Sequence, residues 1–199
     1  MRIAGRAAVV VMSMLSLAAC SASDRASTGD PSTSTNSSPT SAATSPSSGS
    51  SPATNASGPV CTAADIKVTG AAGQKPTITI PTTCQPPKDL LSVDLTPGTG
   101  AAIKAGDTAD MNYLLVTWSD QKEVDTSWQA GRTPYQMKNV GQSPVIQGWN
   151  EGMIGLKEGG RRLLVVPGDK GYGPQGRAPI KPNETLVFVV DAVKVTPAQ

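Results

Sequence analysis

The feature that most limits what this chain can fold into is a long segment made almost entirely of small and polar residues. Of the 199 residues, those from Ser21 to Gly58 are nearly all Ser, Thr, Pro, Ala, Gly or Asn. Such a segment lacks the large apolar side chains whose burial would offset the entropy lost on ordering. We therefore predict that residues 20–59 form a disordered linker. That leaves about 140 residues, the usual size of one domain, to build a single hydrophobic core.

The residues before this linker have the layout of a secretory signal. Arg2 and Arg6 precede an apolar run from Ala7 to Ala19, which is shorter than the roughly 20 residues that a membrane-spanning helix needs. Cys20 completes a sequence that resembles a bacterial lipobox. We therefore predict a lipoprotein signal peptide at residues 1–19 and a diacylglycerol anchor on Cys20, which would hold the exported chain on the outer face of the bacterial cell membrane. An ordinary cleaved signal followed by a chance cysteine is the alternative.

The number of cysteines fits the same compartment. Three cysteines are an odd number for an exported protein, but lipidation of Cys20 leaves Cys61 and Cys84, and we predict a disulfide between these two. Closing a loop of that length would stabilise the fold by roughly 3 kcal/mol in the chain-entropy model. We expect residues 60–88 to form a β extension closed by this bond. Two separate buried thiols are the alternative.

Composition excludes several classes of function. The chain contains no histidine, which excludes Ser-His-Asp and Cys-His nucleophilic centres and zinc sites with histidine ligands. Its formal net charge is +2 and it has no basic run, which argues against nucleic-acid binding. We expect neither a metal nor a cofactor. Coiled-coil heptads do not appear in the sequence, and we expect a monomer.

Hydrophobic periodicity predicts a domain rich in β-structure. Short apolar or alternating segments predict strands at residues 77–80, 90–95, 110–118, 162–166 and 186–195. Because side chains alternate between the two faces of a strand, two sets are expected to share an inner face: Met111, Tyr113 and Leu115, and Leu186, Phe188 and Val190.

One amphipathic helix is predicted to lie across the concave side of this sheet. It would run from Val145 to Leu156, because Ile146, Trp149 and Met153 recur at spacings of three and four. The pair Gly159-Gly160 could end it by supplying a residue with positive φ.

The segment between residues 167 and 184 is predicted to be a functional loop. It is rich in Gly and Pro and carries Tyr172 between two glycines. Structureless loops of this length are uncommon inside compact domains unless they bind something. On its own, a tyrosine between glycines is ordinarily a turn residue.

Four stretches of the chain, in this order and spacing, resemble the FKBP-type peptidyl-prolyl cis-trans isomerases. They are Val145-Ile146-Gln147-Gly148-Trp149-Asn150-Glu151-Gly152, Gly159-Gly160-Arg161-Arg162, Gly171-Tyr172-Gly173 and Ile180-Lys181-Pro182-Asn183-Glu184-Thr185-Leu186-Val187-Phe188. The resemblance extends from about Leu90 to Val195, and we assign residues 89–197 to an FKBP-like isomerase domain. It implies an α+β fold in which a strongly curved antiparallel sheet, a half-barrel, wraps around one short α-helix.

The resemblance also implies a proline-binding pocket with Trp149 as its floor. The expected walls are Tyr113, Val124, Tyr135, Val145, Ile146, Ile180 and Phe188. The expected catalytic groups are the side chains of Tyr113, Asp125 and Tyr172 and the backbone N–H of Ile146. Without the family, each aromatic residue would be assigned to plain core and Asp125 to a turn or cap.

The chain departs from the family pattern at several of these positions. Val124 stands where a phenylalanine is usual, and Arg177 lies near a usual histidine. Pro144 replaces an acidic residue, and Lys181 interrupts a usual Pro-Pro pair. We expect these changes to affect substrate preference and affinity for macrolide ligands more than the fold.

The implied function is isomerisation of Xaa-Pro bonds in exported proteins, by desolvation and hydrogen bonding in an apolar pocket. The partners would be proline-containing polypeptides, with macrolides as further ligands. A proline-peptide-binding or chaperone lipoprotein that uses the same pocket without turnover is the main alternative. A purely structural envelope lipoprotein would explain the linker but not the pocket residues.

Overall fold

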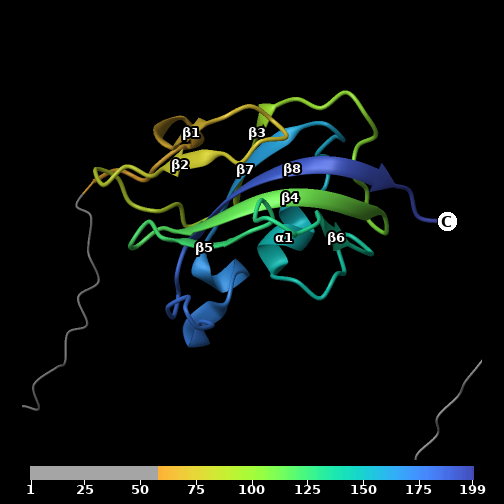
Figure 1. Cartoon of the computed structure of the whole chain (residues 1–199). Helices are drawn as coiled ribbons and strands as arrows, with labels where there is room; N and C mark the ends of the chain where they lie inside the picture. Colours follow the sequence, from red (N-terminus) through yellow and green to blue (C-terminus); the bar gives the residue numbers. More distant parts are fainter. Residues whose placement is uncertain (1–57) are drawn as a thin grey trace, which may run out of the picture. The chain divides into compact units, whose positions relative to one another are not determined.

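The computed structural model describes residues 58–199 (Figure 1). The signal peptide predicted at residues 1–19 and the lipid anchor on Cys20 lie outside the described residues, as does the linker predicted at 20–59 except for its last two residues. In the part of the chain that is described, no helix has the length and apolar character needed to cross a membrane.

A curved antiparallel sheet with one short helix against it forms the body of this unit, which confirms the predicted fold class (Figure 1). Its strands are β3 (Leu91–Thr96), β4 (Thr108–Thr117), β5 (Glu123–Thr126), β6 (Tyr135–Met137), β7 (Arg161–Val166) and β8 (Leu186–Thr196). Their order is β3-β7-β8-β4-β5, and β6 pairs with β4. A separate two-stranded sheet is made by β1 (Lys67–Thr69) and β2 (Thr77–Thr79).

Both faces of the six-stranded sheet are buried. The front face, which carries Phe188, packs around the helix α1 (Gln147–Gly152) in one apolar cluster. All the side chains predicted to share an inner face belong to this cluster: Met111, Leu115, Leu186, Phe188 and Val190 as buried members and Tyr113 packed against them. The back face, which carries Val187, packs in a second cluster with Ile66 and Ile80 of the preceding extension.

The helix is shorter than the sequence predicts. It covers Gln147–Gly152, whereas the periodic pattern suggested residues 145 to 156. Ile146 is the N-cap, with extended backbone angles, and the chain leaves the helix at Met153. Gly155, with φ of 82°, turns the chain away, so the predicted end at Gly159-Gly160 is wrong. The apolar residues on either side of the helix lie in turns, and their side chains still pack against the front face of the sheet.

The other short elements were missed by periodicity. Strands β1, β5 and β6 have three or four residues each, too few for a period of two to stand out. The loop from 167 to 184 is not structureless as predicted, because it contains two 3-10 helices, η2 (Gly168–Lys170) and η3 (Gly173–Gln175). A third, η1 (Ala63–Asp65), lies in the extension.

The extension predicted at residues 60–88 covers the back face of the sheet. The structure joins Cys61 to Cys84 by the predicted disulfide, with a Cα–Cα distance of 5.2 Å. Between them, β1 and β2 form the predicted β-structure. Figure 1 shows this hairpin and α1 on opposite sides of the sheet. The extension therefore completes the core on the side away from the helix.

A buried ion pair fastens the extension to the sheet. Arg161 is 2% exposed and makes two hydrogen bonds to the Asp191 carboxylate, Nε to Oδ1 at 2.6 Å and Nη2 to Oδ2 at 2.8 Å. The same guanidinium donates to the carbonyls of Gly70 and Gln74, and the N–H of Gly73 donates to Asp191. The hydrogen-bond partners of this pair are therefore supplied by the sheet and by the turn between β1 and β2.

Arg162, the next residue of β7, makes the corresponding contacts on the front face of the sheet. Arg162 donates through Nε to Asp94 of β3 at 2.6 Å. Its Nη1 donates to the carbonyls of Gly152 at 2.7 Å and Ile154 at 2.9 Å. Gly152 is the last residue of α1, where carbonyl oxygens have no partner within the helix, and Ile154 lies in the turn just beyond it. Arg162 thus joins the edge strand, the central sheet and the helix.

Removing the charge of Asp191 should destabilise the fold strongly. Asp191→Asn would leave the Arg161 guanidinium buried without its counter-ion, and we expect the free energy of unfolding to fall by about 3 kcal/mol. Denaturant unfolding of the purified protein measures this change. Asp94→Asn is the matched control: the Asp94 side chain is 40% exposed, so we expect a loss of about 1 kcal/mol or less. Equal losses in the two variants would contradict the assignment.

Candidate active site

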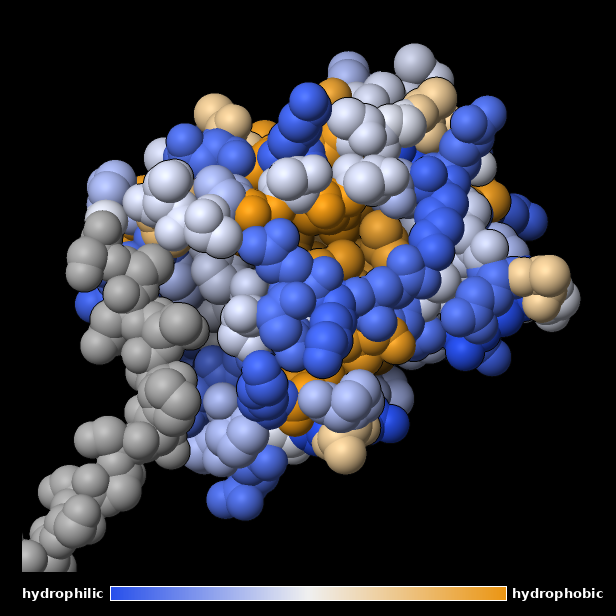
Figure 2. Space-filling model, turned by 60° about the vertical axis from the view of Figure 1, so that its left-hand side comes forward, coloured by the Kyte–Doolittle hydropathy of each residue, from blue (hydrophilic) through white to orange (hydrophobic). Residues whose placement is uncertain are grey.

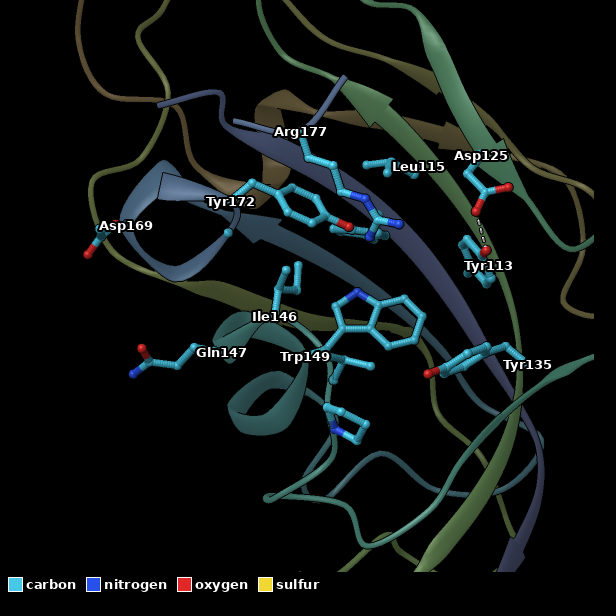
Figure 3. A pocket seen from close by; sticks show the side chains of 14 residues that line it. Tyr113, Leu115, Asp125, Tyr135, Ile146, Gln147, Trp149, Asp169, Tyr172 and Arg177 are labelled. Carbon is cyan, nitrogen blue, oxygen red and sulfur yellow. Dashed lines mark hydrogen bonds between the residues drawn. The ribbon is translucent and has the colours of Figure 1, made fainter. Parts of the chain in front are cut away.

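A cavity of about 630 Å³ lies at the front of the sheet, between β4, the start of α1 and the loop from 167 to 184. Fourteen residues line it: Tyr113, Leu115, Asp125, Tyr135, Pro144, Val145, Ile146, Gln147, Trp149, Asp169, Gly171, Tyr172, Arg177 and Phe188. Figure 3 shows their side chains converging from these separate segments. On the face of the molecule shown in Figure 2, apolar surface lies recessed between polar side chains.

Trp149 forms the aromatic floor of the cavity. It is 5% exposed and meets three other rings edge to face, with centroid distances of 5.4 Å to Tyr113, 5.7 Å to Tyr135 and 5.4 Å to Phe188. Edge-to-face pairs of this kind hold rings in fixed orientations. The Nε1 of Trp149 is buried and has no hydrogen-bond acceptor among the described residues. The floor is therefore a rigid, largely apolar surface.

The helix holds this ring in place by approaching the sheet closely. A Cβ atom on Gly148 would overlap the Val166 side chain, and one on Gly152 would overlap that of Leu164. Asn150, within the helix, accepts a hydrogen bond from the N–H of Ser143, which precedes the helix, and donates one to the Ser143 carbonyl, both at 2.9 Å. The close approach and this clamp together fix the position from which Trp149 projects.

One side of the cavity carries a chain of polar contacts. The Tyr113 hydroxyl donates to Asp125 Oδ2 at 2.5 Å, and Arg132 donates from Nη1 to Asp125 Oδ1 at 2.7 Å. The Thr126 N–H also donates to Oδ1, at 2.9 Å. Asp125 is therefore a carboxylate held by three donors, and it faces the cavity beside Tyr113 (Figure 3).

These contacts separate the pKa values of the two acidic groups. Burial, and then the hydrogen bond to Asp125, raise the pKa of Tyr113 far above its ordinary value of 10.0. Burial would raise the pKa of Asp125, but the hydrogen bonds from Tyr113, Arg132 and the Thr126 backbone outweigh it and lower that pKa below 3.8. At neutral pH the phenol stays protonated and the carboxylate stays ionised. The pair is suited to orienting a ligand and not to exchanging protons with it.

The opposite side of the cavity is built by the loop that contains η2 and η3. Tyr172 is half-buried between these two short helices, and its ring lies under the Arg177 guanidinium at 5.7 Å. The N–H of Asn183 donates to the Gly173 carbonyl at 2.8 Å, which ties the end of the loop to the start of η3. The loop is thus ordered by its own backbone, and Tyr172 projects from it toward Trp149 (Figure 3).

A backbone donor is available at the start of the helix. Ile146 lines the cavity as the N-cap of α1, and its N–H has no acceptor within residues 58–199. The first amides of a helix have no partner inside it. This N–H can therefore bind a ligand carbonyl next to the aromatic floor.

Most of the residues predicted for the pocket do meet at the cavity. Eight of them line it: Tyr113, Asp125, Tyr135, Val145, Ile146, Trp149, Tyr172 and Phe188. Two do not: Val124 and Ile180 belong to the apolar cluster next to it, Val124 as a partly buried neighbour and Ile180 as a buried member.

Other lining residues were not assigned to the pocket from the sequence. Leu115 could have been assigned to the pocket, because it lies two residues after Tyr113 in the same strand and therefore on the same face. Gln147 is the helical residue directly after Ile146, inside the quoted motif. Arg132, which pairs with Asp125 but does not line the cavity, carries no such signal, because it follows Asp125 by seven positions, across the end of β5 and a turn.

Comparison with known proteins identifies relatives of this domain. The model of the family described as FKBP-type peptidyl-prolyl cis-trans isomerase matches residues 100–193. An "FK506-binding protein" from Streptomyces anulatus is 42% identical over 113 residues, which are 56% of this chain and 90% of that protein. A "probable FK506-binding protein" from Corynebacterium glutamicum is 36% identical over 120 residues, which are 60% of this chain and 98% of that protein.

A solved structure agrees with these sequence matches. The crystal structure of FkpA from Escherichia coli is similar with a TM-score of 0.50 and 38% sequence identity. The similarity covers 55% of this chain and 49% of that one.

The ionised Asp125 should make a contribution to stability that is lost in acid. Because the pKa of Asp125 is lower in the folded than in the unfolded protein, its contribution is complete above the unfolded value of about 3.9 and disappears as pH falls through the folded value. The difference in free energy of unfolding between wild type and Asp125→Asn should therefore be constant from about pH 5 to 8 and shrink below about pH 4.

Denaturant titrations at a series of pH values measure this difference. Tyr113→Phe, which removes one of the hydrogen bonds that lower the pKa, should show an effect of the same sign and smaller size. A difference that stays constant down to about pH 2.5 would exclude the pKa shift.

Proposed function

The chain belongs to the family of FKBP-type peptidyl-prolyl cis-trans isomerases, and we propose that the cavity above Trp149 is where it accelerates rotation about Xaa-Pro bonds. The observation that carries this proposal is the combination of an aromatic floor with hydrogen-bond donors at its edge. Ile146 offers a backbone N–H, and Tyr172 offers a hydroxyl for which no acceptor occurs among the described residues.

The chemistry of the imide bond explains why such a cavity would suffice. Rotation must break amide resonance, which sets a barrier of about 18 to 20 kcal/mol, while the two ground states differ by only about 1 kcal/mol. The planar imide has charge separation that the twisted form loses. An apolar surface from which water is excluded therefore favours the twisted form. The reaction needs no nucleophile, which is consistent with a chain that contains no histidine.

In this mechanism each group at the cavity has a separate task. Trp149, Val145 and Phe188 hold the prolyl ring. The Ile146 N–H and the Tyr172 hydroxyl bind substrate carbonyls and fix the two sides of the rotating bond. The Asp125 carboxylate, held by Tyr113 and Arg132, either stabilises the twisted carbonyl carbon or keeps the Tyr113 ring in place.

The magnitudes show that desolvation and positioning must provide most of the effect. An acceleration on the order of 10⁵-fold requires the barrier to fall by about 7 kcal/mol. A single hydrogen bond contributes about 1 kcal/mol net. The two donors therefore account for a minor share, and the remainder must come from the dry aromatic surface.

We propose the same cavity as the binding site for macrolides, because relatives of this chain are named for binding FK506. Val124, where a phenylalanine is usual in the family, lies in the apolar cluster beside the cavity and adds no ring to it. A macrolide would compete with proline peptides for the surface of Trp149. Its affinity should be lower than for a pocket with the usual phenylalanine.

We propose further that the enzyme works outside the cytoplasm as a monomer, held to the outer face of the cell membrane by a lipid on Cys20 and acting on exported proteins. The disulfide between Cys61 and Cys84 supports export, because such bonds persist in oxidising compartments. Mass spectrometry of the mature N-terminus tests the anchor: a mass that fits an unmodified Cys20, or cleavage elsewhere, would exclude it.

A proline-isomerisation assay on short Xaa-Pro peptides tests the catalytic proposal. Wild type should accelerate isomerisation, and Tyr172→Phe should lower kcat/KM about fivefold, the equivalent of one hydrogen bond of about 1 kcal/mol. Asp125→Ala should lower it as well. Asp110→Asn is the control, because Asp110 lies on β4 outside the cavity and, among residues 58–199, its side chain bonds only to Gln136.

The possible outcomes separate the catalytic proposal from its alternative. If neither Tyr172→Phe nor Asp125→Ala changes kcat/KM, these residues do not act in catalysis. If wild type binds proline peptides or FK506 without accelerating any peptide, the chain is a binding or chaperone module that uses the same cavity.

A further inference from the structure

Arg177 is the one cation among the residues that line the described cavity. Its guanidinium lies 5.7 Å from the centre of the Tyr172 ring, a cation–π contact. In the described part of the chain no carboxylate lies within 4.0 Å of it, and its side chain takes part in no hydrogen bond. The charge is therefore balanced by an aromatic face and not by an anion.

The backbone around Arg177 is held in a tight turn, and the guanidinium lies over the Tyr172 ring. The Arg177 N–H donates to the Ile180 carbonyl at 3.0 Å, and the Ile180 N–H donates back at 2.6 Å. Gly176, with φ of 63°, precedes it at a point where a Cβ would contact the backbone of Lys181. Figure 3 shows the Arg177 side chain running along Tyr172, with its guanidinium toward the space above Trp149.

The other charged groups near the cavity leave this positive charge uncompensated. Asp125 already has Arg132 as its partner at 2.7 Å. Asp169 lines the cavity, but Figure 3 shows its carboxylate pointing away from the Trp149 ring. Lys170 and Lys181 are paired with Glu151 and Asp120. The space beside Tyr172 therefore has one unpaired positive charge.

We propose that Arg177 determines specificity by favouring substrates with an aspartate or glutamate next to the proline. This inference rests on the proposed function, because it places the substrate's proline above Trp149 and its flanking residues at the edge of the cavity. A carboxylate there would pair with the guanidinium that lies over the Tyr172 ring, whereas the ammonium group of a lysine would be repelled. Because Arg177 is exposed to solvent, the preference should be a few-fold and should weaken with salt.

Matched peptides with Glu, Gln or Lys placed before or after a single proline test this preference. Wild type should process the Glu peptide about threefold faster than the Gln peptide in kcat/KM, at one or both positions, and the Lys peptide more slowly than either. The Glu-to-Gln ratio should fall toward one as salt is raised from about 0.02 M to 0.5 M.

Substitutions assign the preference to Arg177. Arg177→Gln should bring the Glu-to-Gln ratio to about one, and Arg177→Glu should reverse the order of the Glu and Lys peptides. Lys67→Gln removes the same net charge from β1, on the extension, and should keep the wild-type ratio. Equal ratios in wild type and Arg177→Gln, at both positions, would overturn the inference.

The design separates failure of this inference from failure of the proposed function. If wild type isomerises every peptide at the same rate regardless of charge, only the specificity inference is lost. If wild type isomerises none of them, the catalytic function is lost. In that case, the affinities of the Glu and Gln peptides are measured by titration, and the ratio of these affinities tests the charge preference.

Discussion

The contact between the helix and the sheet is the constraint on which the rest of this domain depends. Gly148 and Gly152 lie one helical turn apart on the face of α1 that meets Val166 and Leu164, and neither position has room for a Cβ. The helix can therefore sit directly on the sheet, with Trp149 projecting from a point set by the backbone. A larger residue at either glycine would lift the helix, move the tryptophan and change the floor of the cavity. The shape of the site follows from the absence of two side chains.

The sequence predicted secondary structure best in long elements whose apolar residues recur at a regular spacing. Strands β4 and β8 were predicted to within a few residues, with the correct side chains on the front face. The helix was predicted twice as long as it is, because apolar side chains keep a spacing of three and four even where the chain is in turns beyond Gly152. Short strands such as β6 have no measurable period, and their place comes from pairing with β4. Local patterns therefore predicted which residues are buried more accurately than they predicted the backbone conformation of those residues.

The polar part of the site was harder to foresee than the apolar part. Periodicity placed Tyr113, Trp149 and Phe188 on buried faces, but their assignment to a pocket, and that of Asp125, came from the family resemblance. The ion pair between Arg132 and Asp125 depends on how a turn folds back across β5. The position of Arg177 over Tyr172 depends on a tight turn closed by Ile180. Tertiary contacts between irregular segments fix both arrangements, and no repeat in the sequence reports them.

The two adjacent arginines of β7 affect how the domain unfolds. Since neighbouring residues of a strand point to opposite faces, Arg161 holds the disulfide-closed extension and Arg162 holds the end of the helix. The layers on either side of the sheet thus share one strand as their common support. Fraying of β7 would release both layers in a single step, so the extension and the helix should belong to one cooperative unit in hydrogen exchange.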